Sequence, residues 1–311
     1  MDITPRTVGR LAVTAAAAGM ATALLAGPAM ATPITTGASA PTAATSAAQT
    51  EANKKLVTYV YDQLFNHFNT AVIDEYFTPD YIQHNPTVPD GPDALRDLVN
   101  YIRTTSPDSQ NHIVRVVAQG DLVLIHTNAV SVPGTKGLDL VDMFRVKDGK
   151  IVEHWDTMQS VPDQTTSGND LFSTLTGPAK GNSASPATTS RNQRLVENYV
   201  DSLTQDRDLK AVDRYVSRSL VQHQPDLANG AAAVKKSFAD LFTAHPQFQA
   251  TVAQVVAEGD LVAVHSHYQN TPDDLGESVY DIYRVEHGKI VEHWSAVQAV
   301  PATSANDNTM F

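Results

Sequence analysis

Residues 150–155, with the sequence KIVEHW, recur unchanged as residues 289–294. Two further motifs repeat at the same distance of 139 residues: YIQHNP at 81–86 returns as LVQHQP at 220–225, and GDLV at 120–123 returns at 259–262. Because the offset is constant, the copies align without net insertion, from Leu56 and Leu195 onward. The 311-residue chain therefore contains two copies of one domain, each long enough to bury its own core.

Within each copy the pattern predicts helices first and strands afterwards. Apolar residues recur at every fourth position at Leu56, Val60, Leu64 and Phe68, as on one face of an amphipathic helix, and a second helix is expected from Asp93. Segments rich in β-branched and aromatic residues follow and are separated by turn sequences: 111–118, 121–131, 138–147 and 150–161. The expected fold class is α+β, with an antiparallel sheet packed on the helices.

The dipeptide Asp148-Gly149 predicts a two-residue hairpin, because a type I′ turn needs positive φ at both central positions. With Lys147 opposite Lys150, counting along the strands places Asp142 opposite Trp155, with Gln159 on the same sheet face. In the second copy the same count places Asp281 opposite Trp294, with Gln298 on that face.

The opposite face of the predicted hairpin also carries polar residues: Arg145, His154 and Asp156, matched by Arg284, His293 and Ser295. This face is either solvated or packed against a second sheet. We favour packing, because an antiparallel sheet with helices on one side leaves its other side free to pair. The pairing would join the two copies within the chain or two chains in a homodimer.

A carboxylate beside a tryptophan in an apolar strand is the main chemical signal in the sequence, since burial of a charge is costly without a partner or a function. His126 and His265 lie in the preceding strand among apolar residues. A histidine and a carboxyl in a dry cleft can divide the roles of general base and general acid, for example in removing a proton next to a carbonyl. The alternative that these histidines are hydrogen-bonded core residues stays open.

Further residues are expected to contact a ligand, because they share the predicted face or lie in turns that overhang the sheet: His84, Trp155 and Gln159, with His223, Trp294 and Gln298 in the second copy. A metal site could draw on His84, His126 and Asp142, or on His265 and His267, but no known ligand spacing occurs and the chain has no cysteine. We therefore expect neither a metal nor a cofactor. The net charge of −12 argues against nucleic acid as a partner.

The N-terminal residues have the features of a secretory signal, with Arg6 and Arg10 before a run of small and apolar residues and an A-x-A site at Ala29–Ala31. A retained membrane anchor is the competing interpretation, but the run is rich in Ala, Gly and Thr and no positive stop follows it. We expect cleavage, and hence a protein that is secreted or lies at the exterior of the cell envelope, without a stable membrane anchor.

The boundaries follow from composition and from the repeat. We expect a signal peptide at 1–31, a flexible linker at 32–50, a first domain at 51–162, a second flexible linker at 163–190, a second domain at 191–301 and a tail at 302–311. The apolar stretch from Leu171 to Leu175 interrupts the second linker. It either docks on a neighbouring domain or is incidental.

The motifs at 81–86, at 120–123 with His126, and at 141–159 resemble those of the SnoaL-like branch of the nuclear-transport-factor-2-like superfamily. The resemblance spans nearly all of 52–162 and, more weakly, 191–301. It implies a cone-shaped domain in which a strongly curved antiparallel sheet wraps around three helices and encloses an apolar pocket. The copies differ within these motifs, where Asp156 becomes Ser295, Asn128 becomes His267 and Asn85 becomes Gln224.

The resemblance also implies chemistry, since SnoaL-type polyketide cyclases perform a cofactor-independent aldol condensation with an acid/base aspartate and a nearby histidine. By this likeness the catalytic candidates are Asp142 with His126 and Asp281 with His265. We expect a lyase or isomerase acting on an apolar or carbonyl-bearing small molecule. The alternatives are a non-catalytic small-molecule binding protein and a structural or interaction module, because fold alone does not decide function.

Overall fold

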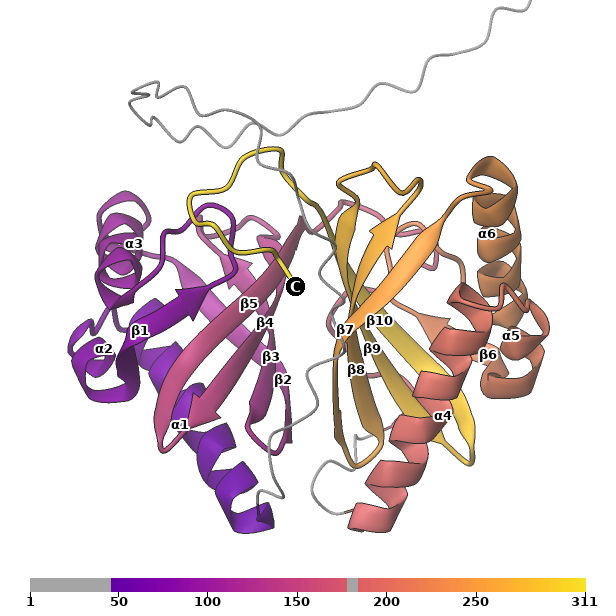
Figure 1. Cartoon of the computed structure of the whole chain (residues 1–311), viewed down its shortest axis with the longest axis horizontal. Coiled ribbons are helices and arrows are strands. Elements are labelled where there is room, and N and C mark those ends of the chain that lie inside the picture. Colours follow the sequence, from indigo (N-terminus) through magenta and orange to yellow (C-terminus); the bar gives the residue numbers. More distant parts are fainter. Residues whose placement is uncertain (1–45, 178–183) are drawn as a thin grey trace, which may run out of the picture. The chain divides into compact units, whose positions relative to one another are not determined.

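The computed structural model describes residues 46–177 and 184–311 (Figure 1). The expected signal peptide and its cleavage site lie outside the described residues, as does most of the first expected linker. Among the helices of the described ranges, none has the length and hydropathy needed to cross a membrane.

The first copy consists of three helices and a five-stranded sheet. Its elements are α1 (Ala47–Phe65), α2 (Ala71–Tyr76), β1 (Phe77–Gln83), α3 (Pro92–Thr105), β2 (Gln110–Gln119), β3 (Leu122–Val130), β4 (Leu138–Lys147) and β5 (Lys150–Ser160). The strand order is β1-β5-β4-β3-β2. All neighbours are antiparallel except β1 and β5, which are parallel.

The second copy repeats this order. Its elements are α4 (Pro186–Thr204), α5 (Lys210–Tyr215), β6 (Val216–Gln222), α6 (Ala231–Ala244), β7 (Gln249–Glu258), β8 (Leu261–Gln269), β9 (Glu277–Glu286) and β10 (Lys289–Ala299). The strand order is β6-β10-β9-β8-β7. The predicted α+β class and the four predicted strands of each repeat are therefore confirmed, whereas the parallel edge strand, β1 or β6, was not foreseen.

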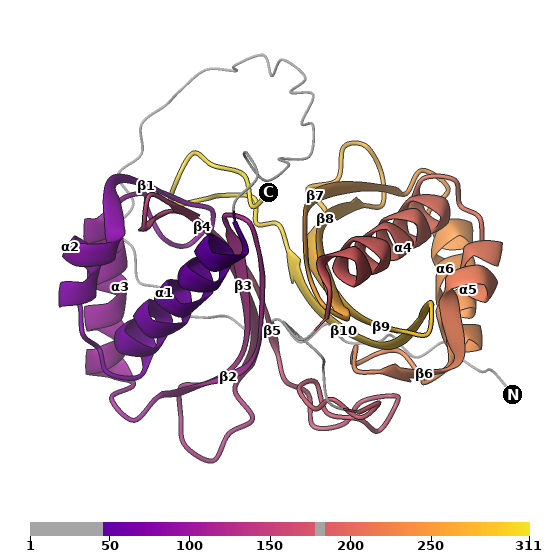
Figure 2. The same cartoon turned by 90° about the horizontal axis from the view of Figure 1, so that it is seen from below.

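Each sheet curves around the helices of its own copy (Figure 2). Helix α1 begins after Ser46, whose hydroxyl accepts a hydrogen bond from the Gln49 N–H and so satisfies a free donor of the first turn. Its buried side chains follow helical spacing and join the residues of the concave sheet face in one core: Val57, Val60, Tyr61 and Leu64. The N-cap of helix α3 is Gly91, two residues before Asp93, the residue that the sequence predicts for this position.

The predicted turn at Asp148-Gly149 is confirmed, because both residues have positive φ, 51° and 74°. The register beyond the turn differs from the prediction. Val146 pairs with Ile151, but Arg145 pairs with Glu153, so that Val152 is an extra residue in β5. Such a β-bulge exchanges the faces on which all later residues of the strand lie.

The prediction that Asp142 faces Trp155 is therefore wrong. Asp142 pairs with Asp156, and Met143 pairs with Trp155. The second copy has the same bulge at Val291, where Asp281 pairs with Ser295 and Ile282 pairs with Trp294. The concave face consequently carries Asp142, Asp156 and Asp281, and the convex face carries the tryptophans.

The convex faces of the two copies pack against each other. One buried cluster joins side chains of both: Val117, Leu122, Leu124, Val141, Met143 and Trp155 with Val256, Leu261, Ala263, Tyr280, Ile282, Trp294 and Ala296. Hydrogen bonds also cross the contact, among them one between Thr157 Oγ1 and Ser278 Oγ at 2.5 Å and one from the Met158 N–H to Gln298 Oε1 at 2.9 Å. The two copies pair through a sheet face, as expected. The face is the convex one, however, and not the face that carries His154 and Asp156.

The segment after each copy binds to the other copy, and the two segments are themselves repeats. The Thr166 N–H donates to the Pro225 carbonyl at 2.8 Å, and 139 residues later the Ala305 N–H donates to the Pro86 carbonyl at the same distance. Leu171, in the apolar stretch noted above, is buried. The expected linker at 163–190 therefore contains an ordered segment, because its polar groups bond to the second copy.

Two glycines of the first copy allow backbone strain in a turn to be separated from steric overlap with a neighbouring strand. Gly137 and Gly149 share a φ of +74°, but a Cβ on Gly137 would overlap the Ala129 carbonyl oxygen, whereas a Cβ on Gly149 would meet open space. Gly149→Ala should lower the free energy of unfolding by about 1–2 kcal/mol from backbone strain alone. Gly137→Ala should cost about 1–3 kcal/mol more, because atoms must also move apart. Urea denaturation measures both, and equal losses would contradict this account.

Candidate functional site

Each copy encloses a cavity between its concave sheet face and its helices. The first cavity has a volume of about 300 Å³ and the second of about 490 Å³. Apolar and aromatic side chains form most of the first wall, including Leu95, Leu98 and Phe144. The ionisable groups in this wall, Asp142, His154 and Asp156, converge from β4 and β5, and an apolar wall with a few such groups is typical of small-molecule sites.

The polar centre of the first cavity is the group Asp142, His154 and Asp156, and all three residues are buried. The bulge at Val152 brings His154 and Asp156 onto the same face as Asp142. His154 Nε2 lies 3.0 Å from Asp142 Oδ1, and His154 Nδ1 lies 2.8 Å from Gln83 Oε1.

Hydrogen bonds from β1 and the following turn fix the orientation of these groups. Gln83 Oε1 also accepts the Asn85 N–H at 2.9 Å, which identifies this atom as the amide oxygen and places a proton on His154 Nδ1. The Asn85 side-chain amide donates to Asp156 Oδ2 at 2.6 Å. Asp156 Oδ1 is buried without a hydrogen-bond partner, which leaves it available to a ligand.

Burial and neighbouring charges change the proton affinity of the cluster. Burial raises the pKa of Asp156 to about 6, and the charge of Asp142 acts in the same direction against the opposing effect of His154. Burial alone would lower the pKa of His154, but its hydrogen bond to Asp142 and the charges of Asp156 and Asp142 raise this pKa above the ordinary value. Asp156 can therefore exchange a proton near neutral pH.

Two tyrosines complete the first cavity. Burial, followed by the charge of Asp142 for Tyr61 and of Asp156 for Tyr81, raises the pKa of both phenols well above the ordinary value. Both therefore remain protonated hydrogen-bond donors. Tyr81 accepts a hydrogen bond from Gln83 Nε2 at 3.2 Å, which leaves its own hydrogen for another acceptor.

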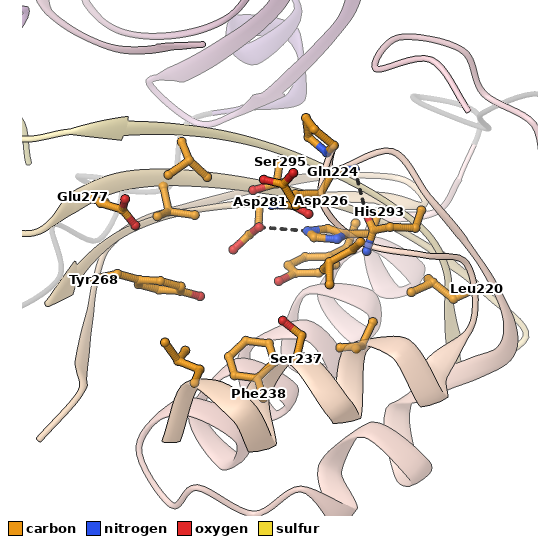
Figure 3. A pocket seen from close by; sticks show the side chains of 18 of the residues that line it. Leu220, Gln224, Asp226, Ser237, Phe238, Tyr268, Glu277, Asp281, His293 and Ser295 are labelled. Carbon is orange, nitrogen blue, oxygen red and sulfur yellow. Dashed lines mark hydrogen bonds and ion pairs between the residues drawn. The ribbon is translucent and has the colours of Figure 1, made fainter. Parts of the chain in front are cut away.

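The second cavity repeats only part of this arrangement (Figure 3). His293 Nε2 lies 2.8 Å from Asp281 Oδ1, and the imidazole stacks on Tyr283 with ring centroids 4.7 Å apart. Ser295 occupies the position of Asp156, so the counterpart of this carboxyl is missing, although Asp226 and Glu277 also line the cavity. Figure 3 shows Phe238, on α6, across the cavity from this pair.

The structure separates the predicted acid/base pairs. Asp142 and Asp281 line the cavities, but His126 and His265 lie on the convex faces. His126 Nε2 bonds to Asp139 at 2.6 Å, and its other ring nitrogen bonds to Arg115. His265 bonds to Ser278 at 2.9 Å. These histidines are hydrogen-bonded residues at the contact between the copies.

The residues predicted to contact a ligand also lie mainly outside the two cavities that the domains enclose. His84 stacks on Trp155 with ring centroids 4.8 Å apart, and His223 stacks on Trp294 at 5.1 Å. Gln298 takes part in the contact between the copies. Gln159 crosses from the first copy, donates to the Ser295 carbonyl at 2.7 Å and lines the second cavity.

Several residues of the first cavity were assigned to the wrong face or not identified, for two reasons. The count along β5 assumed unbroken alternation, which placed His154 and Asp156 opposite to Asp142. The adjacent apolar residues Ile151 and Val152 were the available sign that the alternation breaks. Tyr61 lies on α1, Tyr81 and Gln83 lie on β1, and Asn85 follows β1, all of them far in sequence from β4 and β5.

The geometry of the cluster bears on metal binding as well. Asp142, His154 and Asp156 each present a ligand atom, and these atoms lie within 4.8 Å of one another. Both ring nitrogens of His154 are already hydrogen bonded, to Gln83 and Asp142. Coordination by His154 would break one of these bonds, so the donor set fits proton transfer better than it fits a metal ion.

Solved structures with similar folds cover about one copy of the chain. A protein assigned as a ketosteroid isomerase from Kribbella flavida is 17% identical and aligns with 35% of this chain and 79% of its own, with a TM-score of 0.32. A protein assigned as a polyketide cyclase from Acidithiobacillus ferrooxidans is 16% identical over 35% and 88%, with a TM-score of 0.31. An epoxide hydrolase from M. tuberculosis is 18% identical over 35% and 84%, with a TM-score of 0.30.

Sequence comparison assigns the family. No sequence among the curated proteins matches the chain significantly. The family model of the SnoaL-like domain matches residues 57–154 and again residues 196–293, which together make up more than half of the chain. The two matches are offset by the same 139 residues as the repeat. The chain therefore belongs to the SnoaL-like domain family and contains this domain twice.

Proposed function

We propose that the first cavity is an acid/base site that moves a proton next to the carbonyl group of a small, largely apolar molecule. The observation that carries this proposal is the buried carboxyl of Asp156, which has one oxygen held by Asn85 and the other without a partner in a mostly apolar cavity. Its pKa of about 6 is suited to a base at neutral pH.

The proposed step uses groups of this chain alone. Asp156 Oδ1 takes a proton from the carbon next to the carbonyl, and the electron pair of the broken C–H bond moves onto the carbonyl oxygen as an enolate. The hydroxyl of Tyr81 donates a hydrogen bond to that oxygen, since the phenol stays protonated. Return of the proton from Asp156 to another carbon of a conjugated enolate gives isomerisation. Attack of the enolate on a second carbonyl gives an alkoxide, which takes the proton back from Asp156 to form the aldol product.

Asp142 and His154 support this step electrostatically, because Asp142 helps to hold a positively charged His154 near Asp156. His154 lies between the Asp142 carboxylate and the Gln83 amide oxygen, both of which accept hydrogen bonds. A cationic imidazole in this position stabilises the ionised form of Asp156. Asp142 is therefore part of the proposed site, whereas His126 lies outside it.

For the second cavity we propose ligand binding without the same chemistry. Ser295 replaces the proposed base, while the Asp281 and His293 pair and a cavity of about 490 Å³ remain. We also propose that the protein acts outside the cytoplasm, on the basis of the N-terminal sequence features.

Deuterium exchange tests the proposed base without knowledge of the natural substrate. The full chain should accelerate incorporation of deuterium from D2O next to the carbonyl of 2-tetralone, a small apolar ketone, as measured by mass spectrometry. Asp156→Asn should reduce the rate by about 100-fold or more, because the base is removed. Ser295→Ala, at the matching position of the second copy, should retain the rate. An Asp156→Asn variant as fast as the parent chain would contradict the proposal.

The pH dependence of stability tests the raised pKa independently of activity. A folded-state pKa of about 6, above the unfolded value near 4, gives stability that is present below pH 4 and is lost as the pH rises through about 6. Asp156→Asn cannot titrate, so its stability relative to the parent chain should increase by roughly 2–3 kcal/mol between pH 4 and pH 7.

Urea denaturation at several pH values between 4 and 8 measures this difference. Asp273→Asn, which changes an exposed aspartate of the second copy, is the control and should show no comparable pH-dependent gain. A difference between Asp156→Asn and the parent chain that stays constant across this range would contradict the raised pKa.

A further inference from the structure

We propose that a third cavity, beside Trp155, binds an extended peptide segment of another protein that carries a serine or threonine. This cavity has a volume of about 530 Å³ and is lined by Glu153, Trp155, Gln254 and Phe311, among others. It lies on the convex side of β5 and is separate from the cavities enclosed by the two domains. The proposal does not depend on the acid/base chemistry.

The second copy shows how such a segment binds, because its own equivalent site is filled. Residues 173–176 lie against β10, where Trp294 Nε1 donates to the Ser173 carbonyl at 3.0 Å. The Leu175 N–H donates to Glu292 Oε1 at 2.6 Å. The Thr176 hydroxyl also contacts Glu292, and Arg284 Nη1 donates to the Thr176 carbonyl at 3.0 Å.

Each of the residues that hold this segment has a counterpart around Trp155 of the first copy. At an offset of 139, Trp155 matches Trp294, Glu153 matches Glu292, and Arg145 matches Arg284, with Gln254 in place of Arg115. Phe172, which precedes the bound segment, lies 5.6 Å from His126 between ring centroids, and its counterpart Phe311 lies 5.4 Å from His265. The two sites are therefore built alike as far as Phe172 and Phe311, and the one beside Trp155 contains the third cavity.

Equivalent side chains have different exposed fractions in the filled and in the open site. The side chains of His223 and Glu292 are 0% exposed beneath residues 173–176, whereas those of His84 and Glu153 are 10% and 22% exposed. Arg284 is 2% exposed and Arg145 is 15% exposed. The open site thus presents the same groups without their cover.

Two buried polar atoms indicate what the open site lacks. Trp155 Nε1 and Gln254 Oε1 have no hydrogen-bond partner, although each residue is only 3% exposed. A buried donor without an acceptor is unfavourable, and a peptide carbonyl at the position of the Ser173 carbonyl would satisfy Trp155. A backbone N–H and a hydroxyl would then meet Glu153, which can accept them while it retains His84 and Arg145, as Glu292 does with His223.

The peptide acetyl-Ser-Thr-Leu-Thr-amide, which copies residues 173–176, is the probe for this site. The chain has two tryptophans and therefore two indole N–H signals in a ¹⁵N-labelled sample, and Trp294→Phe assigns them. Titration of the full chain should shift the Trp155 indole signal and leave the Trp294 signal in place. Trp155→Phe should weaken binding about 10-fold, as expected for loss of one buried hydrogen bond, while Trp294→Phe should leave the affinity unchanged.

A second peptide, with proline in place of leucine, lacks the N–H that Glu153 would accept and should bind about 10-fold more weakly. An unmoved Trp155 signal at millimolar peptide would overturn the proposal, as would equal affinities of the two peptides. A Trp155 indole that is already hydrogen bonded and protected from exchange in the free chain would also overturn it, because the chain itself would then fill the site. Because the titration of the parent chain needs no variant, folding of Trp155→Phe does not decide the outcome.

Discussion

One extra residue in a strand, Val152 in β5, determines which side chains meet inside the first domain. Without this bulge His154 and Asp156 would lie on the convex face, and Asp142 would be the only ionisable group of the three in the cavity. With it, the three groups share the concave face, while Trp155 turns outward into the contact between the copies. The same displacement at Val291 directs His293 to Asp281 and Trp294 to the convex side. The cavity chemistry and the pairing of the domains thus depend on the same local irregularity.

The fold and the duplication could be predicted from sequence, because they rest on signals that repeat or have a regular period. The 139-residue offset, the β-rich segments and the Asp148-Gly149 turn all have direct counterparts in the structure. The site could be predicted only in part. Asp142 lines the cavity. Beyond Val152, however, one unpaired residue exchanges the two faces of β5, and a count that assumes strict alternation misses this exchange. His126 looked catalytic as a polar residue in an apolar strand, yet its environment is explained by Asp139 and Arg115 across the convex face.

The two copies are alike in fold and differ where chemistry and binding are concerned. The first cavity has a second carboxyl, at Asp156, where the second has Ser295, while the second cavity is the larger. On the convex side the asymmetry is reversed, because the second copy has its site filled by residues 173–176, whereas the first leaves His84 and Glu153 partly exposed and Trp155 Nε1 without a hydrogen-bond partner. Duplication followed by such divergence would let one chain combine a proposed reactive pocket, a proposed binding pocket and a proposed peptide site.

The central claim is that the first cavity holds a carboxyl able to exchange a proton near neutral pH. Titration of the Asp156 side-chain carbon by ¹³C NMR, assigned with the Asp156→Asn variant, measures this property directly in the intact chain. The account predicts a midpoint near pH 6, with a coupled response of the His154 ring signals. A midpoint near pH 4, the value of an ordinary aspartate, would contradict it.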